Sequence, residues 1–141
     1  MELGTFGSIL KFAIELENEA MEFYKNTATR LGDQKLKDLF GDLSIRGEKR
    51  IKTLERVRRE NTTEMILEPI VDFESDKYTL TTAVLSSKGD EIFHEIALEI
   101  ETKLELFYLT AAKKTEFLSE AAYAFELLAE KNTEAMKRLS S

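Results

Sequence analysis

One short stretch of helical sequence occurs twice in this chain. Residues 13–24 read AIELENEAMEFY and residues 97–108 read ALEIETKLELFY, so alanine, two glutamates, phenylalanine and tyrosine recur at the same spacings. The apolar residues of both copies follow the helical period of three and four. This repeat indicates one helical hairpin written twice, with each copy contributing two helices to a shared core.

The apolar period and its interruptions predict four helices. Long stretches of the chain lack both glycine and proline, which favours long helices over many strands. Gly32 suits a left-handed position after the first helix, and Asp33 suits the N-cap of the second. The predicted helices span residues 5–30, 34–60, 90–112 and 116–139, and Phe117 is placed on the apolar face of the last one.

The segment from about residue 61 to 88 has a different character. The helical period fades there, and the segment contains Pro69, the only proline of the chain. We expect it to be a crossover within one domain over residues 1–141, holding a short helix or an extended piece. The fold is then an all-α four-helix bundle of two antiparallel hairpins, with the second and third helices parallel. The crossover residues expected to pack along the domain are Met65, Ile66, Leu67, Ile70, Val71, Phe73 and Tyr78.

Composition excludes several classes of function. The net charge of −7 argues against a general nucleic-acid-binding surface, which needs a basic patch. The chain has no cysteine, which rules out disulfides, thiolate catalysis and thiolate metal sites. The first residues do not look like a signal peptide, and no apolar run approaches the length of a membrane span. We therefore expect a cytoplasmic protein that binds neither nucleic acid nor membrane.

Two glutamates lie on the apolar faces of the repeated helices. Around Glu17, the residues three and four positions away are all apolar, and Glu101 occupies the matching position of the second copy. An isolated carboxylate in a core is costly, so it tends to be paired, metal-bound or neutralised. Buried glutamates on two equivalent helices are what a carboxylate-bridged metal site needs.

At these residues the chain resembles the rubrerythrin branch of the ferritin-like superfamily. The resemblance covers nearly the whole chain: two helical hairpins, a crossover after the second helix, and an E-x-x-A-x-x-F-Y pattern at Glu17–Tyr24, which Glu101–Tyr108 repeats with Leu104 at the alanine. It implies that Glu17 and Glu101 help to hold a di-iron centre. Family activities include hydrogen peroxide reduction, oxygen-dependent iron oxidation and iron handling. The resemblance also points to a homodimer, although the sequence selects no interface.

The chain departs from this family pattern at the other metal ligands. The pattern requires a Glu-x-x-His pair on each of the second and fourth helices. Gly47 and Arg50 stand at those places on the second helix, and Asn132 and Ala135 stand there on the fourth. Four of the six ligands that the resemblance implies are therefore missing.

The single histidine does not restore the ligand set. His94 lies seven residues before Glu101, which is two helical turns or about 10 Å along the axis. It is too far away to join the same ion. We expect His94 to stand near the start of its helix and to face solvent or the crossover.

We expect Arg50 to take the place of the metal. A guanidinium has five donors and matches a carboxylate well, and the glycine one turn earlier leaves it room to pair with one or both glutamates. The alternative is that Arg50 points to solvent while the glutamates are held by tyrosine hydroxyls and water. The residues expected at the polar centre of the bundle are Glu17, Glu101, Arg50, Asn132, Tyr24 and Tyr108.

Three functions remain as alternatives. The first is a non-catalytic ferritin-like bundle without a cofactor, which acts by binding a partner or by assembling. The second is a non-haem iron or manganese oxidoreductase, peroxidase or iron-handling protein, in which Glu17 and Glu101 hold an ion together with water and Asn132. The third is a helical adaptor or small-ligand binder whose pocket lies where Gly47 and Ala135 replace larger ligands. The missing ligands favour the first, and the sequence names no protein or small-molecule partner.

Overall fold

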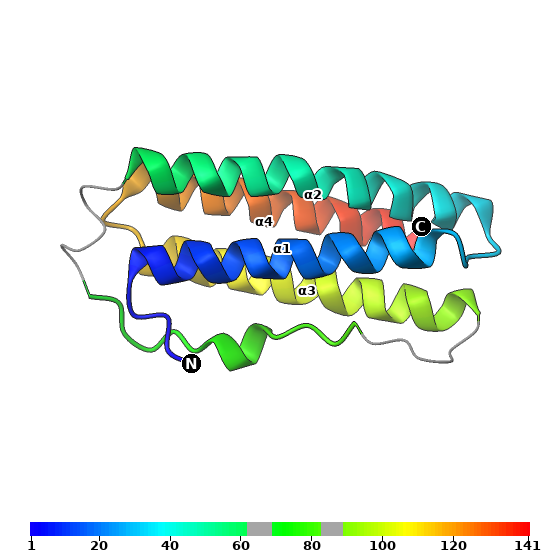
Figure 1. Cartoon of the computed structure of the whole chain (residues 1–141), viewed down its shortest axis with the longest axis horizontal. Coiled ribbons are helices and arrows are strands. Elements are labelled where there is room, and N and C mark those ends of the chain that lie inside the picture. The colour runs from blue at the N-terminus through cyan, green and yellow to red at the C-terminus, as the bar shows by residue number, and fades with distance from the viewer. Residues whose placement is uncertain (62–68, 83–88) are drawn as a thin grey trace.

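Four long α-helices lie alongside one another in the computed structural model, which describes residues 1–61, 69–82 and 89–141 (Figure 1). The all-α prediction is confirmed, because no strand forms in these ranges and Glu2 and Glu74 make only an isolated bridge. The elements are α1 (Phe6–Ala28), α2 (Gln34–Glu60), the 3₁₀ helix η2 (Ser75–Tyr78), α3 (Asp90–Lys114) and α4 (Ser119–Ser140).

The helices pack as two pairs. In Figure 1, α1 and α4 run from left to right, whereas α2 and α3 run from right to left. The main contacts join α1 to α2 and α3 to α4, and smaller ones join α2 to α4 and α1 to α3. Each pair is therefore antiparallel, α2 and α3 are parallel, and these last two stand at opposite corners of the bundle.

The turn between α1 and α2 is fixed by two aspartates. The side chain of Asp33 caps α2 by accepting from the backbone N–H of Leu36 at 2.9 Å, which confirms the predicted N-cap. Asp90, at the start of α3, accepts from the backbone N–H groups of Gly32 and Asp33 at 2.8 and 2.7 Å. The left-handed conformation predicted for Gly32 is wrong: among the described glycines, only Gly89 has a positive φ, at 107°.

The start of α4 differs from its prediction. The helix begins at Ser119, three residues later than expected, because Thr115 and Leu118 form a separate turn in which the N–H of Leu118 donates to the carbonyl of Thr115 at 2.8 Å. Phe117 lies in this turn and is 38% exposed, so its predicted place on the apolar face is wrong.

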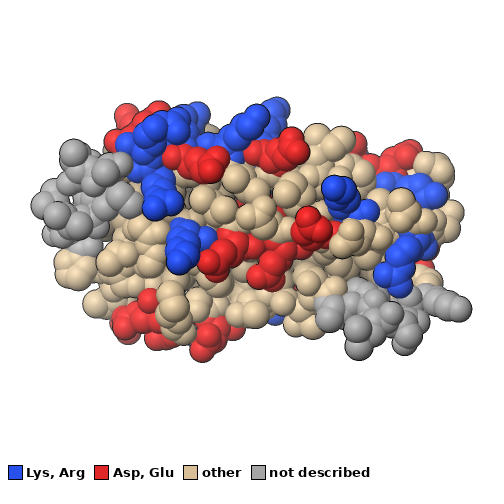
Figure 2. All heavy atoms as spheres, viewed as in Figure 1, with Lys and Arg blue, Asp and Glu red and all other residues tan. Residues whose placement is uncertain are grey.

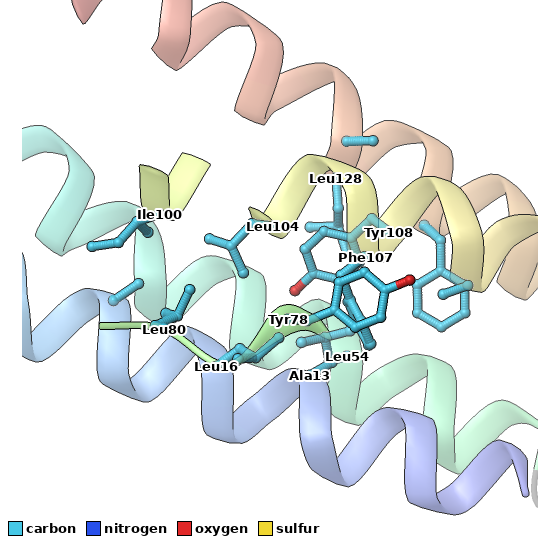
Figure 3. Close-up of a cluster of buried hydrophobic side chains, with 14 of the residues drawn as sticks. Ala13, Leu16, Leu54, Tyr78, Leu80, Ile100, Leu104, Phe107, Tyr108 and Leu128 are labelled. Atoms are coloured by element: carbon cyan, nitrogen blue, oxygen red, sulfur yellow. The ribbon is translucent and has the colours of Figure 1, made fainter. Parts of the chain in front are cut away.

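The core draws on every helix and on the crossover. Figure 3 shows side chains from every helix in one buried cluster, with Tyr78 and Leu80 of the crossover. The helix residues are Ala13 and Leu16 of α1, Leu54 of α2, Ile100, Leu104, Phe107 and Tyr108 of α3, and Leu128 of α4. Backbone hydrogen bonds tie the crossover to the N-terminus, since Leu3 donates to the carbonyl of Phe73 at 2.7 Å. Of the crossover residues predicted to pack, Ile70, Phe73 and Tyr78 are buried, Val71 is 61% exposed and therefore mispredicted, and Met65, Ile66 and Leu67 lie outside the described residues.

Charge is divided unevenly between the helices. α2 carries nine basic and five acidic residues, although the chain as a whole has a net charge of −7. α3 shows the opposite balance, with six acidic and three basic residues. In Figure 2, Lys and Arg side chains gather along the edge formed by α2, and acidic side chains form a band across the middle of the face. None of the described helices has both the length and the apolarity needed to cross a membrane.

Candidate functional site

Two carboxylates stand at the centre of the bundle. Glu17 on α1 and Glu101 on α3 are 1% and 0% exposed. Each accepts a hydrogen bond from the tyrosine of the other copy of the repeat: the hydroxyl of Tyr24 donates to Oε2 of Glu101 at 2.6 Å, and that of Tyr108 donates to Oε2 of Glu17. The repeated sequence therefore folds into a reciprocal pair of tyrosine–glutamate contacts across the core.

Each carboxylate also has its own guanidinium, and both guanidiniums come from α2. Arg50 is buried and donates from Nε to both oxygens of Glu17 at 3.0 Å. Arg46 makes a two-point contact with Glu101, from Nη1 to Oε1 at 2.9 Å and from Nη2 to Oε2 at 2.8 Å. Two-point contacts of this kind are among the stronger hydrogen bonds in proteins. The formal charges of the two pairs cancel.

Asn132 of α4 joins the two pairs into one network. Its amide oxygen accepts from Nη2 of Arg50 at 2.9 Å, and its amide nitrogen donates to Oε1 of Glu101 at 2.8 Å. Arg50 also donates from Nη1 to the backbone carbonyl of Leu128 at 3.2 Å, and its guanidinium lies 5.2 Å from the ring centre of Tyr108. All four helices thus contribute to a continuous polar centre, which contains all six residues that the sequence placed there.

The network shifts the pKa values of Glu101, Arg46 and the two tyrosines. Burial raises the pKa of Glu101, but the charge and hydrogen bonds of Arg46 and the hydrogen bond of Tyr24 outweigh burial and lower this pKa below its ordinary value. Burial lowers the pKa of Arg46, but Glu101 outweighs it and the net shift is upward. Burial, followed by the nearby carboxylate, holds the pKa values of Tyr24 and Tyr108 well above 10. At neutral pH the carboxylate of Glu101 is charged and both tyrosines keep their protons.

Arg46 is the functional residue that sequence reasoning missed. It lies four residues before Arg50, so both side chains project from the same face of α2. That spacing is the signal that could have found it. Among the described residues, Nε of Arg46 is the only buried side-chain polar atom without a hydrogen-bond partner, whereas both terminal nitrogens of Arg46 donate to Glu101.

Gly47 has a different role from the one expected. A Cβ atom added at Gly47 would lie 2.9 Å from both Cβ and Sδ of Met21 on α1, which is too close. The glycine therefore permits the close approach of α1 and α2 rather than leaving room for Arg50. Met21 fills the space beside Gly47, where the small-ligand alternative places part of its pocket.

His94 contacts α4, which corrects the prediction that it faces solvent or the crossover. Its Nε2 donates to the backbone carbonyl of Leu139, and the side chain is half-buried. Leu139 lies in the last turn of α4, where the carbonyls have no partner within the helix. The histidine thus caps the end of α4 and stands apart from the polar centre.

The residues at the centre do not fit a di-iron group. Across the ranges that the structure describes, no three residues among His, Cys, Asp and Glu are grouped to hold a metal ion. All four oxygens of Glu17 and Glu101 accept hydrogen bonds from guanidinium groups. A divalent cation at this place would lie beside two positive side chains that already neutralise the carboxylates.

No protein-family model, curated protein or solved structure matches this chain.

Proposed function

We propose that this chain is a ferritin-like bundle of the rubrerythrin kind in which a network of ion pairs has replaced the di-iron centre. Such a protein acts by binding or assembling and not by metal-based catalysis. The bundle would keep the hairpin–crossover–hairpin arrangement of that superfamily, with α2 and α3 as its parallel pair.

One observation carries this proposal: each central carboxylate is matched by its own arginine. Arg50 neutralises Glu17 and Arg46 neutralises Glu101, at donor–acceptor distances of 2.8 to 3.0 Å. A buried carboxylate that loses its metal would be an unpaired charge, which is costly in a core. Two guanidiniums remove that cost and leave a core without a vacancy for an ion.

The proposal is tested by binding of metal to protein purified without chelator. Elemental analysis should find iron and manganese far below one ion per chain. In anaerobic titrations, ferrous iron and manganese should leave the melting temperature of the wild type unchanged. A metal raises the melting temperature only when it binds the folded state, and the folded state has no site for either ion. Ferrous iron with hydrogen peroxide should give no turnover.

A matched variant separates the centre from the acidic surface. The chain has 27 acidic residues, and some of them will bind cations weakly. The variant Glu17→Gln/Arg50→Met/Glu101→Gln/Arg46→Met removes both central carboxylates together with the arginines that would otherwise be left unpaired, so any surface binding should be equal in both proteins. Stoichiometric metal that the wild type holds and this variant loses would contradict the proposal. It would support the alternative, an iron or manganese oxidoreductase with an altered carboxylate site.

A further inference from the structure

A long groove runs between α2 and α4 on the outside of the bundle. Its larger part has a volume of about 620 Å³ and is continuous with a second hollow of about 440 Å³, because both are lined by Arg56, Ala124 and Leu127. Along α2 the groove extends from Asp42 to Asn61. Ile45 and Leu127 at its edges are 73% and 41% exposed, and Tyr123 at its far end is 61% exposed.

The middle of the groove is positively charged, and one exposed apolar side chain, Ile45 or Tyr123, lies near each end. Lys49 and Arg56 line it from α2, and Lys131 lines it from α4. Lys49 forms no ion pair with any carboxylate in the described part of the chain, and Arg56 and Lys131 pair only with exposed glutamates of their own helices. In the larger part Asp42 is the one acidic residue, and it is already paired with Arg138 at 2.9 Å, whereas Glu60 and Glu120 line the second hollow. The groove therefore suits an acidic partner with apolar ends.

α3 carries a stripe of that kind on its outer side. Ile92, Leu106 and Leu109 are 40%, 53% and 48% exposed, although they are large apolar residues. Glu95 and Glu99 are exposed between them, and Glu99 is paired with Lys103 of the same helix at 3.0 Å. The positions are separated by three, four, seven and three residues, so they share one face of the helix. In order, this α3 stripe reads apolar, acidic, acidic, apolar and apolar.

The two surfaces match in length as well as in pattern. The stripe from Ile92 to Leu109 spans 17 residue steps, or about 26 Å of helix. The groove from Asp42 to Asn61 spans 19 steps, or about 28 Å. Ile45 and Tyr123 lie near the two ends of the groove, and the cations lie between them. A helix laid into the groove could set its acidic middle against these cations and its apolar ends against apolar side chains.

We infer that the α2–α4 groove binds the α3 stripe of a second copy of this chain. α2 and α3 stand at opposite corners of the bundle. One molecule therefore contacts one partner through its groove and a different partner through its stripe. The contact is head-to-tail, so it adds molecules in a ring or a chain and does not stop at a two-fold dimer. Its charged contacts lie at the surface, so the association weakens as salt rises.

This inference deepens the assembly role proposed above but stands on surface residues alone. Sedimentation velocity at increasing protein concentration tests it. At low salt the wild type should show masses above the 16.2 kDa of one chain, including species larger than a dimer. In 0.5 M NaCl the dissociation constant should rise at least tenfold. A wild type that stays monomeric at millimolar concentration overturns the inference, whatever the metal titration shows.

Two variants identify the surfaces. Leu127→Glu places a negative charge in the groove, and Leu106→Arg places a positive charge in the stripe. Each alone should remain monomeric, because growth needs both surfaces. An equal mixture should form a dimer that stops at two chains, since the intact groove of one variant meets the intact stripe of the other. Assembly by either variant alone, or a mixture that stays monomeric, contradicts the head-to-tail contact.

Matched controls keep this test independent of folding. Asn18→Glu and Asn18→Arg introduce the same two charges on the exposed side of α1, away from both surfaces, and should assemble as the wild type does. Circular dichroism and melting temperature establish that each variant is folded. If either leucine variant unfolds, the pair Lys49→Glu and Glu95→Lys changes exposed side chains. Each of these two variants should be monomeric alone, and an equal mixture should assemble, because the reversed charges attract each other as the original charges do. Any other pattern from this second pair overturns the inference.

Discussion

Arg46 holds the carboxylate of Glu101 through both of its terminal nitrogens, across 55 positions of sequence, at 2.9 and 2.8 Å. The contact fixes α2 against α3, its diagonal neighbour in the bundle. It also gives Glu101 the counter-charge that Arg50 gives Glu17. The centre of this protein is thus built from two ion pairs, each with a carboxylate from the repeated helices and a guanidinium from α2.

Removing Arg46 should strongly destabilise the fold. Arg46→Met leaves the carboxylate of Glu101 buried with only Tyr24 and Asn132 as donors, and breaking a buried pair in this way costs about 3–5 kcal/mol. Urea denaturation measures the loss. The double variant Arg46→Met/Glu101→Gln should recover much of it, because no unpaired charge remains. The control Arg56→Met breaks a pair between side chains that are 54% and 53% exposed, and should change stability by less than about 1 kcal/mol.

The two tyrosines should contribute similarly, because they occupy matching positions. Tyr24→Phe and Tyr108→Phe each remove one hydrogen bond to a charged carboxylate, and each should lower the free energy of unfolding by about 1.5–3 kcal/mol. Tyr123→Phe removes a hydroxyl from a side chain that is 61% exposed and should have little effect. If the Tyr24 and Tyr108 variants match the Tyr123 control, the reciprocal contacts do not stabilise the core.

Replacing each of the two glycines within α2 by alanine should change the stability of the fold in opposite directions. Gly41 has no atom within 4 Å of a Cβ added to it, so Gly41→Ala should stabilise the helix by about 0.5–1 kcal/mol. At Gly47 the added Cβ would lie 2.9 Å from the Cβ of Met21. Because that neighbour is fixed to the backbone of α1, Gly47→Ala should destabilise by about 1–3 kcal/mol. Thermal melts of both variants measure the contrast, and a stabilised Gly47→Ala protein would show that α1 and α2 are not in close contact there.

Stability should be highest over a broad range around neutral pH. The pKa of Glu101 is lowered in the fold, so its contribution is present above its unfolded pKa of about 4.5 and is lost as pH falls through the folded value. The pKa values of Tyr24 and Tyr108 are raised in the fold, so their contribution is present below their unfolded pKa of about 10 and is lost as pH rises through the folded values. Urea midpoints from pH 3 to 11 should fall at both ends, and Tyr24→Phe should reduce the alkaline decrease.

The apolar period made the helices predictable, because it records which side of each helix is buried. It also placed Glu17 and Glu101 inside the core, since a single charged residue among apolar neighbours is visible in sequence. Arg46 was not visible in this way, because an arginine on a basic helix looks like a surface residue until its long side chain is seen to reach inward. The sequence also does not show why position 47 is a glycine. The reason is the close contact with Met21, which lies on another helix and is far from Gly47 in the sequence.

The most direct test of the central claim is anomalous X-ray scattering at the iron edge from crystals grown with excess ferrous iron under anaerobic conditions. The ion-pair account predicts no anomalous peak between Glu17 and Glu101, with the guanidinium groups of Arg46 and Arg50 in contact with both carboxylates. An ordered iron peak coordinated by either carboxylate, with the arginines displaced from the centre, would contradict it.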